Sequence, residues 1–485
     1  MSHGRAARIF ACLCAVEAAM VVTLAGIYKA PGLRWTLLSA STRVVLVASA
    51  LGLVVSAWLL VRQIAASGPR RGRVFTLALA ANLSTGLVAL LLLEGAVRLA
   101  ARTTPEGLVG PVAIRPTWSE LTAQSRAVLA GAVRWDTWDP SYLVPDPQLG
   151  TVGPDRRSAD GLYASSRDGI RTAEPGIRLA AGTSGARVAL IGDSNAFSLE
   201  VPFNESWGHH LERRLGPAVP VLNFGVDGHG LDQTYLRYQR DVRAWKPRVV
   251  LISLMGHELL RTMSVYPFVS FLWPPCVVKP RFTIDRGELQ LLNAPLPTHD
   301  EILGAGRLQQ LPFVDYDVGY GTSDWRWRFD HGPLALRLLT SAFPRRPVPG
   351  SRVSVEATVA LNSRLLRALV ESAERDGAVA LVVVMAESKN GLLEDTLTRA
   401  GVSRLDVGEC LRRVPADRRK VPSGDHYTGL ANEALARCTA PAVERALAGS
   451  SAGRARPLQG RGVQSSPAYR LSSSLIHEPF VAGLR

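Results

Sequence analysis

Residues 187–195 read RVALIGDSN, an apolar run that ends abruptly in glycine, aspartate, serine and asparagine. A short run rich in branched apolar side chains and bounded by a polar turn is typical of a buried strand. Asp193, Ser194 and Asn195 are all good N-cap residues, so the turn would lead directly into a helix. Two interpretations follow: a capped strand-to-helix turn only, or such a turn with a nucleophilic serine at the positive end of the helix.

Further apolar runs of the same kind follow along the chain, and helical patterns lie between them, for example over 205–215 and 231–245. Strands that alternate with helices indicate a parallel sheet that helices cover on both faces. We therefore predict an α/β fold, a three-layer α/β/α sandwich around a parallel sheet, over residues 105–448. The additional predicted strands are PVLNFGV (220–226), RVVLISLM (248–255) and AVALVVVM (378–385).

Two segments interrupt this pattern. Residues 263–350 are rich in proline, tryptophan and phenylalanine, and we expect them to form a long insertion within the domain rather than a separate domain. From residue 449 the chain is rich in serine, glycine and arginine and has no periodicity. Such a composition buries too little apolar surface to fold, so residues 449–485 are predicted to be a disordered tail.

Three apolar stretches precede the α/β domain, at about 9–28, 44–61 and 74–93. Each is close to the length that a membrane-spanning helix needs. We therefore predict a membrane anchor of three transmembrane helices over residues 1–104. A cleaved signal peptide is the alternative for the first stretch, but its length and the two stretches that follow it favour a span.

Arginines in the loops predict the orientation of this anchor. The short loop between the second and third stretches carries Arg62, Arg70, Arg71 and Arg73. Because positive loops stay on the cytoplasmic side, the N-terminus is expected inside and everything after Ala100 outside. The predicted localisation is a multi-pass protein of the cell membrane with an extracytoplasmic α/β domain.

Charge and cysteine content exclude other classes of protein. The net charge is +15, but the basic residues are scattered and no nucleic-acid-binding motif is present, so we predict no nucleic-acid partner. The five cysteines show no CxxC or Cys/His spacing, so we predict no metal and no cofactor. In an oxidising compartment Cys410 and Cys438 could form a disulfide. The sequence leaves open whether they pair or are unrelated thiols.

Polar clusters follow the predicted strands. Ligands of open parallel sheets bind at the carboxyl ends of the strands, where such clusters would meet. One cluster alone would mean little, but four in this order indicate a site at this edge of the sheet. They are Asp193–Asn195, Asp227–Gly230, Gly256–Glu258 and the segment VPSGDHYTGLANEALA (421–436), which contains Asp425 and His426.

These clusters resemble the conserved blocks of the SGNH/GDSL hydrolases. VALIGDSNAFSLEVPFNESW resembles the first block, which would make Ser194 the nucleophile, and LNFGVDGHGLDQ the second, with Gly228 as its glycine. ISLMGHELLR is similar to the third block, and GDHYTGLANEALA to the block that carries the catalytic histidine, here His426. YLVPDPQLG and SRDGIRTAEPG are similar to the lead-in strands of membrane-anchored bacterial members. The resemblance covers about residues 140–447 and implies a flavodoxin-like sandwich.

The resemblance also implies a mechanism. Ser194 would attack an ester carbonyl after His426 takes its proton. The backbone N–H groups of Ser194 and Gly228 would stabilise the resulting oxyanion. Asp193 would tie the turn together by hydrogen bonds rather than act on the substrate.

The sequence departs from the family pattern at two places. The third block usually presents an asparagine as the third oxyanion donor, and here His257 occupies its place; its ring N–H is either a substitute donor or part of an ordinary packed histidine. The aspartate expected two or three residues before the histidine is replaced by Gly424 and Ser423. Asp425, directly adjacent, is therefore the candidate acid. A serine–histidine dyad, help from Ser423, and a capping role for Asp425 remain alternatives.

Topology and resemblance together predict a membrane-anchored serine esterase. It would remove O-acyl groups, such as acetyl, from a cell-envelope glycan or lipid, with an acylated glycan or lipid as substrate and membrane lipid around its anchor. One alternative is an O-acyltransferase that acts on an envelope or exported polysaccharide with an acyl-donor partner in the membrane. Another is a non-catalytic envelope-binding protein with a decayed site, which the two departures would favour.

Overall fold

The computed structural model describes most of the chain, in two compact units. The first unit contains residues 1–123 and the second contains most of the rest. The described residues are 3–28, 40–100, 102–104, 107–109, 113–114, 118–129, 142–177, 179, 187–270, 277–320, 334, 354–385, 390–422 and 426–451.

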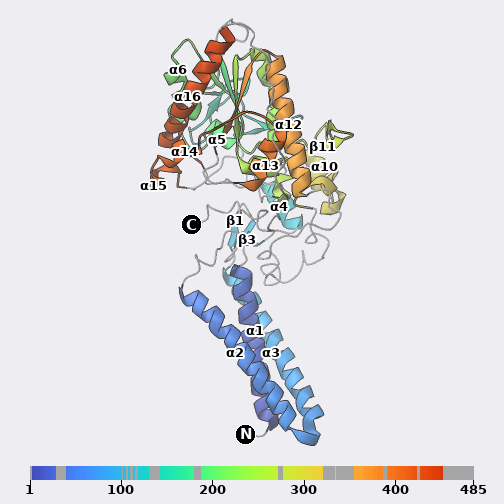
Figure 1. Ribbon diagram of the computed structural model, residues 1–485. Helices are drawn as coiled ribbons and strands as arrows, with labels where there is room; N and C mark the ends of the chain where they lie inside the picture. Colours follow the sequence, from blue (N-terminus) through green and yellow to red (C-terminus); the bar gives the residue numbers. More distant parts are fainter. Residues whose placement is uncertain are drawn as a thin grey trace. The chain divides into compact units, whose positions relative to one another are not determined.

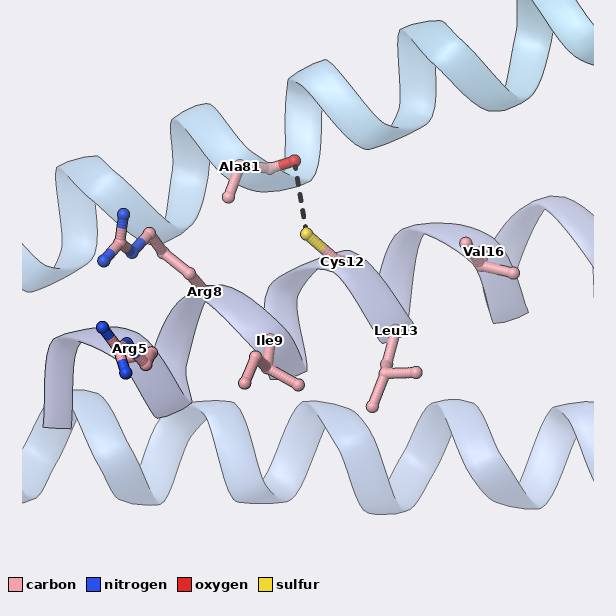
Figure 2. A pocket seen from close by; sticks show the side chains of 7 residues that line it. All are labelled: Arg5, Arg8, Ile9, Cys12, Leu13, Val16 and Ala81. Atoms are coloured by element: carbon pink, nitrogen blue, oxygen red, sulfur yellow. Dashed lines mark hydrogen bonds between the residues drawn. The ribbon is translucent and has the colours of Figure 1, made fainter. Parts of the chain in front are cut away.

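The first unit consists mainly of three long helices, α1 (His3–Tyr28), α2 (Ala40–Ala66) and α3 (Arg71–Ala100). Small side chains pack between α1 and α3, and Asn82 Nδ2 donates to the carbonyl of Ala11 (2.8 Å). A groove along α1 carries two arginines at one end, and Ala81 of α3 contributes to its wall (Figure 2). The helices are followed by three short antiparallel strands, β1 (Arg102–Thr104), β2 (Gly107–Val109) and β3 (Ala113–Ile114), and then by α4 (Trp118–Leu129).

Among the described residues, one helical stretch is long and apolar enough to cross a membrane. It is Gly68–Leu99, which consists of α3 and the short turn that leads into it. Only 6% of its most apolar window is buried, so it is not the core helix of a globular unit within the described residues. The prediction of three transmembrane helices is thus supported for the third span alone. The side chains described for α2 begin at Ala50, so this helix contributes only the shorter apolar stretch Ala50–Ala66.

The second unit contains a seven-stranded sheet with the order β14-β13-β10-β8-β9-β7-β6. The five strands from β14 to β9 are parallel, whereas β7 and β6 are antiparallel to their neighbours. The predicted α/β fold with a mainly parallel sheet is therefore confirmed, with an antiparallel edge that the lead-in segment supplies. The strands are β6 (Ala164–Ser165), β7 (Arg171–Thr172), β8 (Val188–Ile191), β9 (Val221–Asn223), β10 (Val249–Leu254), β13 (Val379–Val384) and β14 (Arg404–Asp406).

Helices cover both faces of this sheet (Figure 1). Successive side chains of a strand point to opposite faces. Accordingly Val188 and Leu190 of β8 belong to one buried cluster, and Ala189 and Ile191 belong to the other. One face carries α6 (Trp207–Leu215), α14 (Gly408–Arg412) and α16 (Gly429–Ser451), and the other carries α7 (Leu231–Arg237), α8 (Gly256–Arg261), α12 (Val355–Arg375) and α13 (Gly391–Ala400).

The described part of the predicted insertion contacts the α/β core through buried charges. Lys279 forms an ion pair with Asp232 of α7, and both side chains are buried. Within the segment itself, Asp317 accepts hydrogen bonds from Ser264 Oγ (2.9 Å) and from the backbone N–H groups of Val265 and Tyr266. The segment contains α9 (Pro267–Ser270), the hairpin β11 (Phe282–Asp285)–β12 (Glu288–Leu291), and α10 (His299–Gly304). The predicted disordered tail lies outside the described residues, apart from the end of α16.

Candidate active site

Ser194, the candidate nucleophile, lies at the turn between β8 and the short helix α5 (Ser194–Phe197). Asp193 is the N-cap residue, and its Oδ1 accepts a hydrogen bond from the N–H of Asn195 (2.9 Å). Gly192 has φ +148°, and a Cβ there would lie 2.7 Å from Ser253 Cβ, so the turn requires glycine. Ser194 is the first residue of the helix and its side chain is almost fully buried. The predicted capped strand-to-helix turn is present.

The loop after β9 packs directly against this turn. Val226 N–H donates to the carbonyl of Gly192 (3.1 Å), and Asn223 Nδ2 donates to that of Ala196 (2.9 Å). A Cβ on Gly225 would lie 2.4 Å from the backbone nitrogen of Phe197, so only glycine permits this approach. Gly228 follows in the left-handed region with φ +76°. The structure thus brings the first two predicted clusters together.

His257, at the start of α8, reaches the same turn. Its Nε2 lies 2.7 Å from Asp193 Oδ2, which also accepts a hydrogen bond from Arg261 Nη1 (3.0 Å). Burial would raise the pKa of Asp193, but the hydrogen bond from His257 and the charge of Arg261 outweigh it and hold this pKa well below its usual range. Asp193 is therefore a buried carboxylate that positions other side chains, as the sequence predicts.

This contact changes the interpretation of His257. Burial, and then the charge of Arg261, lower the pKa of the ring, so it is neutral at neutral pH. A neutral imidazole has one N–H, and here the ionised Asp193 accepts it. The predicted donation from His257 to an oxyanion would therefore require a protonated ring. The structure gives the single N–H of the neutral ring a different acceptor.

Glu258 lies beneath the same carboxylate. It is completely buried, and its Oε1 accepts a hydrogen bond from Met255 N–H (3.0 Å). Burial and the nearby charge of Asp193 raise its pKa well above the usual value. The possible ligand atoms of Asp193, His257 and Glu258 lie within 4.8 Å of one another. Arg261 already supplies positive charge to Asp193, so this cluster is a poor cation site.

His426 lies three residues before the start of α16 and contacts an acid that the sequence pattern did not indicate. Its Nδ1 is hydrogen-bonded to a carboxylate oxygen of Glu200, and both side chains are mostly buried. The predicted acid, Asp425, lies outside the described residues. Glu200 follows Ser194 by only six residues, but nothing in the sequence pattern marks it as a partner of a distant histidine.

Comparisons with known proteins give few matches. No family model matches the chain, and no curated protein matches it. Among solved structures, TesA is 14% identical over 54% of this chain and 99% of its own, with a TM-score of 0.29. A protein assigned to the G-D-S-L lipolytic family from Desulfitobacterium hafniense is 13% identical, over 53% and 99% respectively, with a TM-score of 0.27. LAE5, an alpha/beta hydrolase enzyme from the metagenome of Lake Arreo, Spain, is 15% identical over 55% and 97%, with a TM-score of 0.29. TM-scores this low do not establish a relationship with any of the three.

Proposed function

We propose that this chain is a membrane-anchored serine esterase of the SGNH/GDSL type, which removes O-acyl groups such as acetyl from a cell-envelope glycan or lipid. The observation that carries the proposal is the histidine–carboxylate contact. The carboxylate of Glu200 binds Nδ1 of His426, so Nε2 is the nitrogen that can take a proton. Ser194 lies on the capped turn six residues before that carboxylate. A serine and an oriented imidazole are the two groups that acyl transfer requires.

In the proposed reaction, Ser194 Oγ attacks the acyl carbonyl while His426 Nε2 takes the hydroxyl proton. The tetrahedral intermediate collapses to an acyl-enzyme, and His426 returns the proton to the departing alcohol. Water then attacks the acyl-enzyme by the same route and releases the acid. Ser194 Oγ and His426 share no hydrogen bond within the described residues, so these groups would have to approach each other in the substrate complex.

The proposed oxyanion donors are the backbone N–H groups of Ser194 and Gly228. Both belong to turns that the contacts of Gly192 and Gly225 hold together. Donors fixed in advance need no reorganisation when charge develops, and removing one typically lowers kcat by about 10²–10³-fold. His257 supports this arrangement indirectly, because it binds Asp193 at the N-cap.

The proposed anchoring is supported by apolar surface on the helices of the first unit. Contiguous exposed apolar surface on a soluble protein is normally small, so a lipid environment accounts for this amount. Exposed large side chains occur along both α2 and α3. They include Leu51, Val54, Val55, Trp58, Val61, Phe75, Leu79, Leu83, Leu87, Val88, Leu90, Leu91 and Leu92.

The proposed extracytoplasmic location of the α/β unit has separate support. Cys410 of α14 and Cys438 of α16 are joined by a disulfide, the pairing that the sequence left open. Disulfides persist mainly in oxidising compartments outside the cytosol. Together with the arginines at the turn between α2 and α3 and in the helix ends beside it, this favours a cytoplasmic N-terminus and a substrate in the cell envelope.

The full chain in detergent tests the proposal. We expect p-nitrophenyl acetate to be hydrolysed, and we expect Ser194→Ala and His426→Ala each to lower turnover to background. His299→Ala, which removes a histidine from α10, is the matched control and should keep wild-type activity. If the wild type does not hydrolyse the ester but a fluorophosphonate labels Ser194, the chain is an acyltransferase without its donor. Neither turnover nor labelling would overturn a catalytic function and leave the envelope-binding alternative.

A further inference from the structure

We infer that Glu200 is the carboxylate that positions His426, so that the acid comes from the loop after the serine and not from the segment before the histidine. The contact between Glu200 and His426 does not depend on the proposed function. The catalytic role that the inference gives to His426 rests on that function. In a serine–histidine–acid arrangement the acid binds Nδ1–H, which fixes the tautomer and turns Nε2 toward the nucleophile. Glu200 makes that contact, through Oε2.

The backbone around Glu200 has an unusual conformation. Ser198 and Glu200 both lie in the left-handed region, with φ of +62° and +65°. This conformation is unfavourable for a non-glycine residue, and it persists only where the surroundings impose it. Two such residues within three positions direct the Glu200 side chain to a place that an ordinary helix continuation would not reach.

Arg171 imposes this conformation from the lead-in strand β7. Its guanidinium is buried and donates to the backbone carbonyls of Phe197, Ser198 (2.5 Å) and Val201 (2.5 Å), on both sides of Glu200. It also lies over the ring of Phe197, 4.5 Å from the centroid. Burial lowers the pKa of Arg171 to about 10, so it stays charged at neutral pH. Arg171 thus holds the loop through its backbone.

Other contacts fix the two left-handed residues individually. The N–H of Glu200 donates to the hydroxyl of Tyr163 (2.9 Å), and the N–H of Trp207 donates to Ser198 Oγ (3.0 Å). The ring of Tyr163 packs against Phe197, with 5.4 Å between the centroids. The lead-in segment therefore supplies both an aromatic wall and a buried cation to the loop. We infer that the lead-in segment in this way helps to hold the Glu200 carboxylate against Nδ1 of His426.

Kinetics of the full chain separate Glu200 from the acid that the sequence suggests. We expect Glu200→Gln to lower kcat by about 10²–10⁴-fold with less than about a threefold change in KM, as losing the orienting acid does in a serine–histidine–acid enzyme. Glu200→Asp, which keeps the charge, should recover at least about tenfold of that loss. Glu205→Gln, the same substitution five residues further along the chain, is the matched control and should stay near wild type. A large loss in Asp425→Asn with normal activity in Glu200→Gln would overturn the inference.

Proton NMR of the same proteins gives a readout that needs no turnover. A proton held between Nδ1 of an imidazole and a carboxylate resonates far downfield. We expect such a signal in the wild type and in Glu205→Gln, and its loss in both Glu200→Gln and His426→Ala. If the wild type neither hydrolyses esters nor reacts with fluorophosphonate while the signal behaves as expected, the proposed function fails and the positioning contact stands. A signal that persists in Glu200→Gln overturns the inference whatever the activity.

Discussion

Asp193 and His257 are joined by a hydrogen bond of 2.7 Å at the turn that carries Ser194. Because Arg261 binds the same carboxylate oxygen, Asp193 stays ionised and accepts the single N–H of the neutral imidazole. The ring therefore supports the turn rather than the oxyanion. An asparagine in this place, as in the SGNH/GDSL pattern, would have an amide N–H to direct at the substrate.

Replacing His257 by alanine distinguishes the two roles. A hydrogen bond to a charged group contributes about 1.5–3 kcal/mol, so we expect the free energy of unfolding to fall by about that amount. We expect kcat to fall less than tenfold, because no direct oxyanion donor is lost. Urea denaturation and ester hydrolysis of the full chain measure both quantities, with His210→Ala as the control. An unchanged stability with a loss of 10²-fold or more in kcat would restore His257 as an oxyanion donor.

Arg171→Lys tests the support of the Glu200 loop. A lysine has no planar guanidinium, so it cannot donate to carbonyls on both sides of Glu200 at once. We expect the free energy of unfolding to fall by about 1–3 kcal/mol. We also expect a lower kcat at a similar KM. Arg187→Lys is a matched control, since Arg187 is also buried and donates to a backbone carbonyl, that of Trp245 (3.3 Å). We expect Arg187→Lys to lower the free energy of unfolding but to leave kcat unchanged when kcat is measured under conditions in which the variant is folded. Equal effects of the two substitutions on kcat would argue against a positioning role for Arg171.

The parts of the fold that the sequence predicts correctly have local signals. β8, β9, β10 and β13 are apolar runs that end in polar turns, and each lies within its predicted range. The short strands β6 and β7, of two residues each, show no periodicity because two residues cannot form a pattern. β7 joins the sheet by pairing with β9, and β6 by pairing with β7; both pairings depend on the tertiary structure.

The same distinction applies to the candidate site. The turn at Ser194 is marked by its N-cap residues, whereas Gly228 is predicted only from the resemblance of its segment to the second SGNH/GDSL block. The contact between Glu200 and His426 joins residues 226 positions apart and depends on two left-handed residues whose identities do not favour that conformation. No rule of spacing could predict it. The pairing of Cys410 with Cys438 likewise follows from the packing of α14 on α16.

The Cys410–Cys438 disulfide closes a loop that contains His426. Closing a loop of 28 residues should stabilise the fold by about 3–4 kcal/mol through the entropy of the unfolded chain. We expect the double variant Cys410→Ser, Cys438→Ser to lose about this free energy in urea denaturation and to become insensitive to dithiothreitol. The wild type treated with dithiothreitol should match the variant. Identical stability of oxidised wild type and variant would contradict the prediction.

His229 should make the stability of the α/β unit depend on pH. The ring is fully buried and its Nε2–H donates to the carbonyl of Thr151 (2.9 Å). Burial, and then the charge of Arg237, lower its pKa from 6.5 to about 3. The unfolded chain therefore binds a proton below pH 6.5 that the folded chain does not bind until about pH 3. Stability must fall as the pH drops through this range, by about 1.4 kcal/mol per pH unit.

His229→Gln keeps an N–H donor for Thr151 but cannot titrate. Between pH 7 and pH 5 we expect the wild type to lose about 2 kcal/mol more of its unfolding free energy than the variant, which is about 1.5 pH units of that slope. Urea denaturation at the two pH values measures the difference. The titration of His257, whose pKa is also lowered, is present in both proteins and cancels in the comparison. Equal losses in the two proteins would mean that His229 is protonated in the folded state, in conflict with its burial beside Arg237.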